Sequence, residues 1–300
     1  MLDRIDLSNK LDKATYKRLM PELSESLYQL QKASWDAGIP VIILFEGWDA
    51  AGKGSSIQCL TRPLDPRGYK LYPIQSARPF EKKRPWLWRF WRALPVRGEW
   101  TIFDRSWYGR VMVERVENLI PENEWRRAYR DIVEFERTLV DDGHLILKFF
   151  LHISKEGQRR RFNKLSKNKN TAWHVTEEDW LHHRQYDVWL RAYEEAFERT
   201  DVEWCPWQII GATNRRYTRM RVCQTVVEAL RGKLGLDSES WMIAEQALQE
   251  TAVTSNDQGT KVQTEPAVAM EAGGEAPERD PTEPEPTGGE PLTISDTEGA

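Results

Sequence analysis

The chain has 300 residues, of which 30% are charged and 40% hydrophobic, as is typical of a soluble globular protein. Its formal net charge is −4, but residues 251–300 hold eleven Asp or Glu and two Lys or Arg, so they carry −9 and residues 1–250 carry +5. The first twenty residues mix both charge signs, and no apolar run approaches the roughly 18 residues of a membrane span. We therefore exclude a signal peptide and a membrane protein, and expect a cytoplasmic protein whose basic body binds an anion.

The apolar patterns along the chain predict alternating helices and strands. Residues 14–36 repeat leucine at helical spacing, and residues 41–45 form the β-branched, apolar run of a strand buried on both faces. Further strands are predicted at 69–74, 100–103, 144–153 and 207–211, and further helices at 55–64, 84–94, 122–140, 154–167, 177–199 and 215–234. This alternation predicts an α/β protein, a three-layer sandwich with a parallel sheet between helices.

The chain divides into three predicted parts. The folded domain is expected to span residues 14–236, with a helical lid at about residues 155–180 and an N-terminal extension at residues 1–13. Residues 265–287 are rich in Pro, Glu and Gly and contain almost no large apolar side chain, so they cannot bury enough surface to offset the entropy of ordering. We expect residues 237–300 to be an acidic, largely disordered tail.

A glycine-rich segment follows the first predicted strand and opens a helix, which is the context of a phosphate loop. The residues expected to contact phosphate are Gly47, Ala50, Ala51, Gly52, Lys53, Gly54 and Ser55. Glycines let backbone N–H groups turn toward the phosphates, the helix N-terminus adds partial positive charge, and Lys53 reaches the transferring group. Gly54 occupies the position where such loops usually have Ser or Thr. The loop also carries Asp49, which is expected to hold a metal or position the acceptor, or alternatively to brace the loop.

An acidic residue ends the strand predicted at 100–103. In open α/β sheets ligands bind at the carboxyl ends of the strands, so Asp104 is expected to hold Mg²⁺ directly or through water, with helix capping as the alternative. Arg105 follows and is expected to stabilise charge on the transferred phosphoryl group. Glu114 and Arg115 lie in the next helical segment, where they either face the cleft or pair with each other.

Two basic segments have more than one reading. Arg160 lies on one helical face with Lys164 and Lys167, which suits a lid that closes over a polyanion, and with a phosphate loop present this is preferred to a solvated basic face. In residues 84–92 arginines alternate with aromatic residues. Leu87, Trp88, Trp91 and Leu94 form an apolar stripe there, so core packing is preferred to an anion channel or to single-strand nucleic-acid or membrane binding. His182 and His183 show no catalytic spacing and are assigned no chemical role.

Several motifs in the chain resemble those of the polyphosphate kinase 2 family, in the same order. They are FEGWDAAGKG (45–54), LDPRG (64–68), PWLWRFWRALPVRG (85–98), FDRSWYGRVMVERV (103–116), FLHISKEGQRRRF (150–162) and TEEDW (176–180). The similarity runs from about residue 14 to residue 234 and is closest to the polyphosphate:AMP phosphotransferase branch. Gly54, unusual in a generic phosphate loop, fits this family's own version of it.

The resemblance implies a thymidylate-kinase-like P-loop fold and reversible phosphoryl transfer between inorganic polyphosphate and AMP, ADP or GDP. It implies Mg²⁺ as the cofactor, with Mn²⁺ as an alternative. It assigns metal binding to Asp49 and Asp104, and phosphate binding to Lys53 and Arg105, and these four are the expected catalytic residues. The other candidates it suggests are Arg159, Arg160 and Arg161, which guide polyphosphate, and Glu114 on the nucleotide side.

The expected function is thus Mg²⁺-dependent phosphoryl transfer between polyphosphate and a nucleoside mono- or diphosphate, AMP to ADP and/or ADP to ATP. Two alternatives stay open: an ATP-dependent nucleoside monophosphate kinase, and a non-catalytic nucleotide- or nucleic-acid-binding module. A homo-oligomer is expected, and neither nucleic acid nor a membrane is expected as a partner. Family members of the AMP branch often carry two tandem domains, whereas this chain has one, so the acceptor preference stays open.

Overall fold

A computed structural model describes residues 1–236, and its central element there is one parallel sheet. The strands, in the order β2-β3-β1-β4-β5, are β2 (Tyr69–Pro73), β3 (Trp100–Asp104), β1 (Val41–Gly47), β4 (Leu145–His152) and β5 (Trp207–Gly211). Every neighbouring pair is parallel. All five strands lie within two residues of their predicted positions, so the predicted α/β sandwich is confirmed. The tail expected at residues 237–300 lies outside the described residues.

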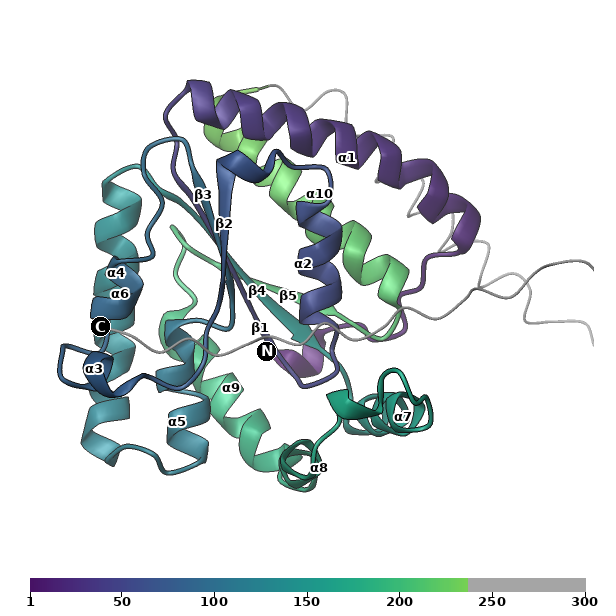
Figure 1. Ribbon diagram of the computed structural model, residues 1–300, viewed down its shortest axis with the longest axis vertical. Coiled ribbons are helices and arrows are strands. Elements are labelled where there is room, and N and C mark those ends of the chain that lie inside the picture. The colour runs from purple at the N-terminus through teal and green to yellow at the C-terminus, as the bar shows by residue number, and fades with distance from the viewer. Residues whose placement is uncertain (237–300) are drawn as a thin grey trace, which may run out of the picture. The chain divides into compact units, whose positions relative to one another are not determined.

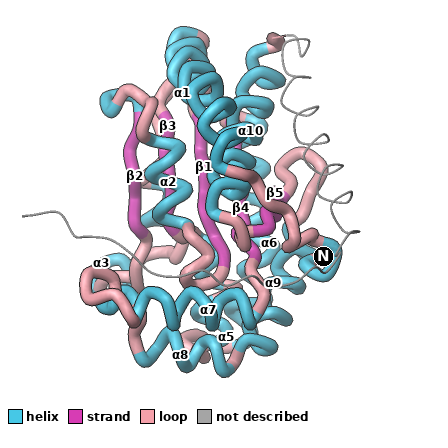
Figure 2. Tube along the Cα trace, turned by 90° about the vertical axis from the view of Figure 1, so that its right-hand side faces the viewer, coloured by secondary structure: helices cyan, strands magenta, loops and turns pink. Residues whose placement is uncertain are grey.

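Helices cover both faces of the sheet (Figures 1 and 2). One face carries α1 (Lys13–Asp36), α2 (Lys53–Thr61) and α10 (Arg215–Leu234), and the other carries α6 (Glu122–Asp141) and α9 (Tyr186–Thr200). Beyond the carboxyl ends of the strands lie α7 (Lys155–Ser166) and α8 (Glu177–Arg184). The short elements are η1 (Leu2–Arg4), η2 (Pro66–Gly68), α3 (Pro79–Lys82), α4 (Trp88–Trp91), η3 (Trp107–Arg110), α5 (Val113–Val116) and η4 (Ala172–His174). No helix in residues 1–236 is long and apolar enough to cross a bilayer.

A buried ion pair lies inside the otherwise apolar core, between β4 and α6. The side chains of Lys148 and Glu136 are both fully buried, and Lys148 Nζ lies 2.9 Å from Glu136 Oε2. The same amine donates to the hydroxyl of Tyr108 and the backbone carbonyl of Thr200, and Trp107 Nε1 donates to the other carboxylate oxygen. These bonds leave neither charge unpaired, which is the condition for tolerating charges in a core.

The continuous helix predicted at residues 84–94 is wrong. Only the single turn of α4 forms there, between Pro85 and Pro95, which disfavour helical conformation at the two ends of the predicted range, residues 84 and 94. The predicted apolar stripe is wrong in part: Leu87 and Leu94 pack against the core, whereas the Trp91 side chain is 47% exposed, and Phe90 and Ala93 are buried. Core packing therefore holds for this segment, with partly different residues facing inward.

One more predicted helix is interrupted, and the N-terminal residues pack on the domain. The helix predicted at residues 177–199 breaks at Gln185, which separates α8 from α9 and lets Tyr186 begin the second helix. Residues 1–13, expected as an extension, pack on the domain, with Leu2 and Leu11 buried. Their backbone is anchored as well, since Arg216 Nε donates to the carbonyl of Leu11.

Candidate functional site

The carboxyl ends of β1 and β3 meet at one edge of the sheet. Phe45 and Asp104 are register partners, and the N–H of Arg105 donates to the Phe45 carbonyl at 3.0 Å. The segment after β1 is the predicted phosphate loop, residues 47–54, so its Asp49 lies beside Arg105. Their side chains pair at 2.9 Å between Nη2 and Oδ1. Residues that are 56 positions apart in the chain thus form one charged cluster.

The loop backbone has the conformation that glycine favours. Gly47 has φ 133° and Gly52 has φ 105°. A Cβ on Gly47 would lie 2.5 Å from the carbonyl oxygen of Leu151 in β4, so no larger residue fits there. Ala50 also has a left-handed φ of 59°. The helix α2 begins directly after this loop and has no side-chain cap, which leaves its first N–H groups to receive an anion.

Lys53 folds back over the loop. Its amine donates to the carbonyl of Gly47 at 2.6 Å and of Trp48 at 3.2 Å, and it lies 4.0 Å from Asp49 Oδ1. Burial and the nearby charge of Arg105 lower the pKa of Lys53, while Asp49 opposes the shift. The ammonium is therefore held inside the loop that the sequence assigns to phosphate.

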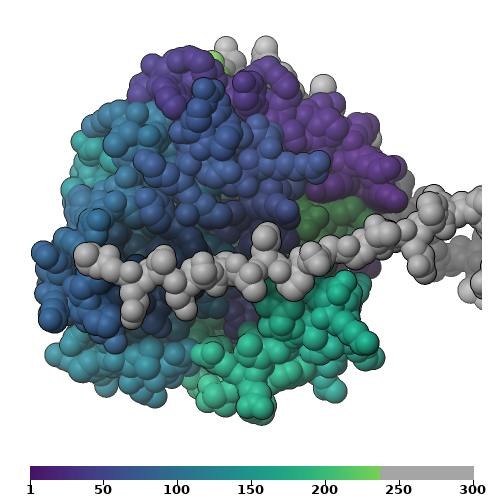
Figure 3. Space-filling view, viewed as in Figure 1, coloured from purple at the N-terminus to yellow at the C-terminus, as the bar shows by residue number. Residues whose placement is uncertain are grey.

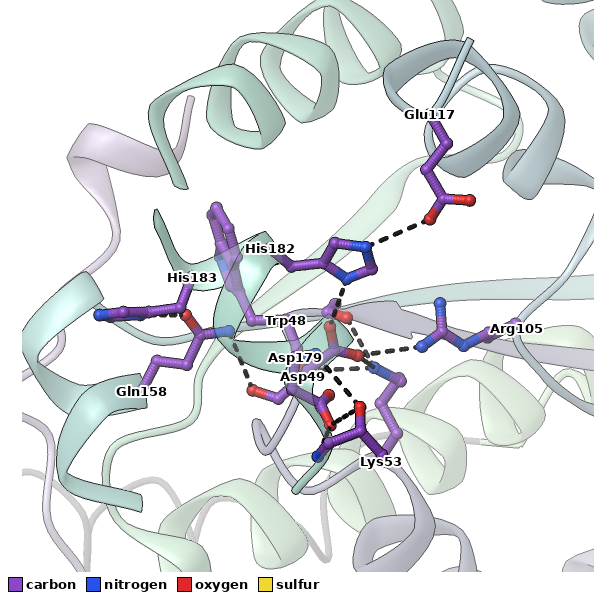
Figure 4. A network of polar contacts seen from close by, with 11 residues as sticks. Trp48, Asp49, Lys53, Arg105, Glu117, Gln158, Asp179, His182 and His183 are labelled. Carbon is purple, nitrogen blue, oxygen red and sulfur yellow. Dashed lines mark hydrogen bonds and ion pairs between the residues drawn. The ribbon is translucent and has the colours of Figure 1, made fainter. Parts of the chain in front are cut away.

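Asp49 stands among three cationic side chains (Figure 4). Oδ1 faces Arg105 and Lys53, and Oδ2 lies 3.4 Å from Nδ1 of His182. Burial opposes ionisation, yet the His182 hydrogen bond and the charges of Lys53 and Arg105 keep the pKa of Asp49 well below its usual range. Asp49 is thus a carboxylate at neutral pH.

His182 reaches this cluster from α8, and sequence reasoning assigned it no role. Its other ring nitrogen, Nε2, lies 3.3 Å from Oε1 of Glu117, the residue that ends α5. Its hydrogen bond to Asp49 raises the pKa of His182. Two carboxylates facing the two nitrogens favour the imidazolium, in which both nitrogens donate. His183, the next residue, contacts Oε1 of Gln158 at 2.8 Å. No local pattern marked these residues, because their partners lie 25 or more positions away.

A second acid missed by sequence reasoning is Glu46, at the end of β1. It is buried and accepts a hydrogen bond from Ser106 Oγ at 2.8 Å. Burial raises the pKa of Glu46, although the bond from Ser106 opposes the shift. The sequence did contain a signal for this residue, because Glu46 is the only charged residue in the otherwise apolar strand β1. The charges of Lys53 and Arg105 act on the Glu46 carboxyl group and also oppose the shift.

The donor set suits a hard divalent cation at the sheet edge. Within residues 1–236 the side chain of Asp104 makes no hydrogen bond or ion pair, although its charge acts on Lys53 and Arg105. Its carboxylate is therefore available as a ligand. Asp49 contributes a second carboxylate from the neighbouring strand end, currently paired with Arg105 and His182.

Comparison with known proteins decides the family. The family model for polyphosphate kinase 2 (PPK2) matches residues 10–235. The chain belongs to the polyphosphate kinase 2 family. It is 39% identical over 230 residues to the polyphosphate:AMP phosphotransferase of Pseudomonas aeruginosa, covering 77% of this chain and 46% of that protein. It is 36% identical to the AMP/ADP-polyphosphate phosphotransferase of Meiothermus ruber, covering 73% of this chain and 80% of that protein.

A solved polyphosphate kinase 2 structure agrees with the fold. The crystal structure of a polyphosphate kinase 2 from Pseudomonas aeruginosa superposes with a TM-score of 0.76 at 38% identity, covering 79% of this chain and 51% of that one. The chain thus spans about half the length of the Pseudomonas aeruginosa phosphotransferase and of the solved chain that it matches.

The other residues assigned from the polyphosphate kinase 2 resemblance lie in different settings. Arg159 and Arg160 are exposed on α7, whereas Arg161 is partly buried and its guanidinium donates to backbone carbonyls. Glu114 pairs with Arg110 at 2.6 Å, and Arg115 pairs with Glu195 at 2.6 Å. The suggestion that Glu114 and Arg115 pair with each other is therefore wrong.

Proposed function

We propose that this polyphosphate kinase 2 family member transfers a phosphoryl group between inorganic polyphosphate and a nucleotide, reversibly, from AMP to ADP and/or from ADP to ATP. The observation that carries the proposal is the meeting of Lys53 and Arg105 with Asp49 and Asp104 at one sheet edge, beside the uncapped start of α2. The polyphosphate:AMP phosphotransferase and the AMP/ADP-polyphosphate phosphotransferase among its relatives support the same substrates.

The charges of the site suit phosphoryl transfer, which needs in-line positioning and charge neutralisation more than covalent help. Lys53 and Arg105 bind the phosphates between donor and acceptor, and the loop N–H groups hold the transferred group. Mg²⁺, or Mn²⁺ in its place, held by Asp104 and Asp49, would neutralise charge on the phosphate oxygens when bound. The terminal phosphate oxygen of the acceptor attacks, so no side-chain nucleophile is required.

The exposed cations of α7 give polyphosphate a path to this cluster. Arg159, Arg160, Lys164 and Lys167 are all exposed there, on the segment that forms the lower right of the face in Figure 3. A chain of phosphates carries about one charge per unit, so it gains from several such cations at once. Glu114 is a candidate for contacts on the nucleotide side. We propose one catalytic domain, residues 14–236, in a homo-oligomer without a nucleic-acid or membrane partner.

A nucleotide panel tests the proposal. Purified protein is incubated with Mg²⁺ and either long-chain polyphosphate or ATP as donor, with AMP, ADP, GMP and GDP as acceptors, and products are separated by chromatography. We expect ADP or ATP to form only when polyphosphate is present. Transfer from ATP without polyphosphate would favour an ATP-dependent nucleoside monophosphate kinase. Salt-dependent oligonucleotide binding without any turnover would favour a non-catalytic binding module.

A further inference from the structure

Five consecutive carbonyl groups of the phosphate loop, those of residues 47–51, accept hydrogen bonds from side chains. Lys53 serves the first two, as described above. The other three are served by α7: Gln158 Nε2 donates to the Asp49 carbonyl at 3.3 Å, and Arg161 Nη1 donates to those of Ala50 and Ala51, each at 2.7 Å. Side chains of α7, the helix expected to act as a lid, thus form hydrogen bonds with the loop backbone.

These bonds determine where the loop N–H groups point. In a planar trans peptide the C=O and the next N–H point in opposite directions. Fixing the carbonyls of Asp49 and Ala51 toward α7 therefore turns the N–H groups of Ala50 and Gly52 away from it. Within residues 1–236 neither of these N–H groups donates a hydrogen bond. They stay available to a phosphate, and Ala50 keeps its left-handed φ of 59°.

Further hydrogen bonds fix the side chains of Gln158 and Arg161 in the orientation that contacts the loop carbonyls. Gln158 is buried, and its Oε1 contacts His183, so its amide nitrogen is turned to the Asp49 carbonyl (Figure 4). The second terminal nitrogen of Arg161 donates to the carbonyls of Ala212 and Thr213, just after β5. Burial lowers the pKa of Arg161 to about 10. Its two terminal nitrogens are thus engaged by four carbonyls, unlike those of the exposed Arg160.

We propose that Gln158 and Arg161 are positioning residues that shape the phosphate loop, and that Arg161 does not bind polyphosphate. The inference rests on the proposed function and deepens it, and it differs from the expectation that Arg159, Arg160 and Arg161 share one role. A residue that shapes the loop acts on the transferring phosphate through Ala50 and Gly52. A residue that binds polyphosphate acts through its own charge, so its contribution depends on salt and on polyphosphate length.

Steady-state kinetics separate the two roles, with Arg161→Gln compared with Arg160→Gln on the same helix. We expect Arg161→Gln to lower kcat at least tenfold, with less than a twofold change in the KM for polyphosphate and an unchanged salt dependence of kcat/KM. We expect Arg160→Gln to act mainly through a higher KM and a weaker salt dependence. A raised KM with preserved kcat in Arg161→Gln would overturn the proposal.

A double-mutant cycle tests whether Gln158 and Arg161 act on the same loop. The losses in Gln158→Leu and Arg161→Gln are expected to be clearly less than multiplicative when combined, because either change alone releases the loop. The combination of Gln158→Leu with Arg160→Gln is expected to be multiplicative. If the losses combined in the same way in both double variants, Gln158 and Arg161 would not act on the same loop. Thermal unfolding shows whether each variant is folded. If Arg161→Gln does not fold, Arg161→Lys, which keeps the charge, is used in its place, and we expect it to show the same loss of kcat.

Equilibrium binding keeps this inference separate from the proposed function. Long-chain inorganic polyphosphate is titrated into each variant by calorimetry, without nucleotide. We expect Arg161→Gln to bind it within twofold of the wild type, and Arg160→Gln to bind it more weakly. Weaker binding by Arg161→Gln alone would overturn the inference, whatever the turnover. Absence of turnover by the wild type would instead count against the proposed function.

Discussion

Nδ1 of His182 lies 3.4 Å from Oδ2 of Asp49, although the two residues are 133 positions apart in the chain. The contact joins α8 to the phosphate loop, and the same imidazole reaches Glu117 at the end of α5. Three elements that surround the sheet edge are thereby connected through one side chain (Figure 4).

Removing this imidazole should loosen α8. His182→Ala deletes the hydrogen bond to Asp49 and the ion pair with Glu117, and together the two partly exposed contacts are expected to contribute about 1.5 kcal/mol. Amide hydrogen exchange in residues 177–184 should therefore become about tenfold faster. His174→Ala is the matched control, because His174 is exposed and stacks on Trp173 in η4. Equal protection of α8 in wild type and His182→Ala would show that the contact does not hold the helix.

Gly47 and Gly54 should respond oppositely to alanine. A Cβ on Gly47 would lie 2.5 Å from a β4 carbonyl, whereas a Cβ on Gly54 would have nothing within 4 Å. Gly47→Ala should lower the free energy of unfolding by about 3 kcal/mol or more, through the clash and the left-handed φ. Gly54→Ala, within α2, should raise it by about 0.5–1 kcal/mol. Urea unfolding measures both, and similar midpoints for the two variants would contradict this backbone geometry.

The buried ion pair between Lys148 and Glu136 predicts a large loss of stability when Lys148 is replaced, and a recovery when Glu136 is replaced as well. Lys148→Met leaves the Glu136 carboxylate without its cation, and breaking a buried pair costs about 3–5 kcal/mol. The double variant Lys148→Met/Glu136→Gln removes the unpaired charge and should recover most of that loss. Urea unfolding of the two variants compares them directly. A double variant as unstable as Lys148→Met would show that the charge is not the cause.

His152 predicts a loss of stability in mild acid. Trp48 Nε1 donates to its Nδ1 at 2.9 Å, so the ring must be neutral, and burial lowers the pKa of His152 to about 4. The unfolded chain, with a pKa near 6.5, binds this proton more readily, so stability falls as the pH drops from about 6.5 to about 4, by at most about 3 kcal/mol. His152→Asn keeps an acceptor without titrating. Its unfolding free energy should fall less over this window, and parallel curves would rule out His152 as the source.

The strands and the phosphate loop were predictable from local signals. Residues 41–47 combine a buried apolar run with a glycine-rich turn, and parallel strands place Asp104 at the same edge. The failures have physical causes. At residues 84–94 the apolar pattern did not show that only one helical turn forms between Pro85 and Pro95. The contacts of His182, Gln158 and Arg161 with the loop depend on how α7 and α8 fold over it, which no spacing in the chain specifies.

The most direct test of the account is the turnover of Lys53→Ala with polyphosphate, Mg²⁺ and the preferred nucleotide. Lys32→Ala is the matched control, because Lys32 is an exposed lysine on α1 paired with Asp36. We expect Lys53→Ala to lose at least about 10²–10³-fold in kcat while thermal unfolding shows that it is still folded at the assay temperature, and Lys32→Ala to keep full activity. Wild-type turnover by a folded Lys53→Ala protein would contradict the claim that this loop is where the phosphoryl group is transferred.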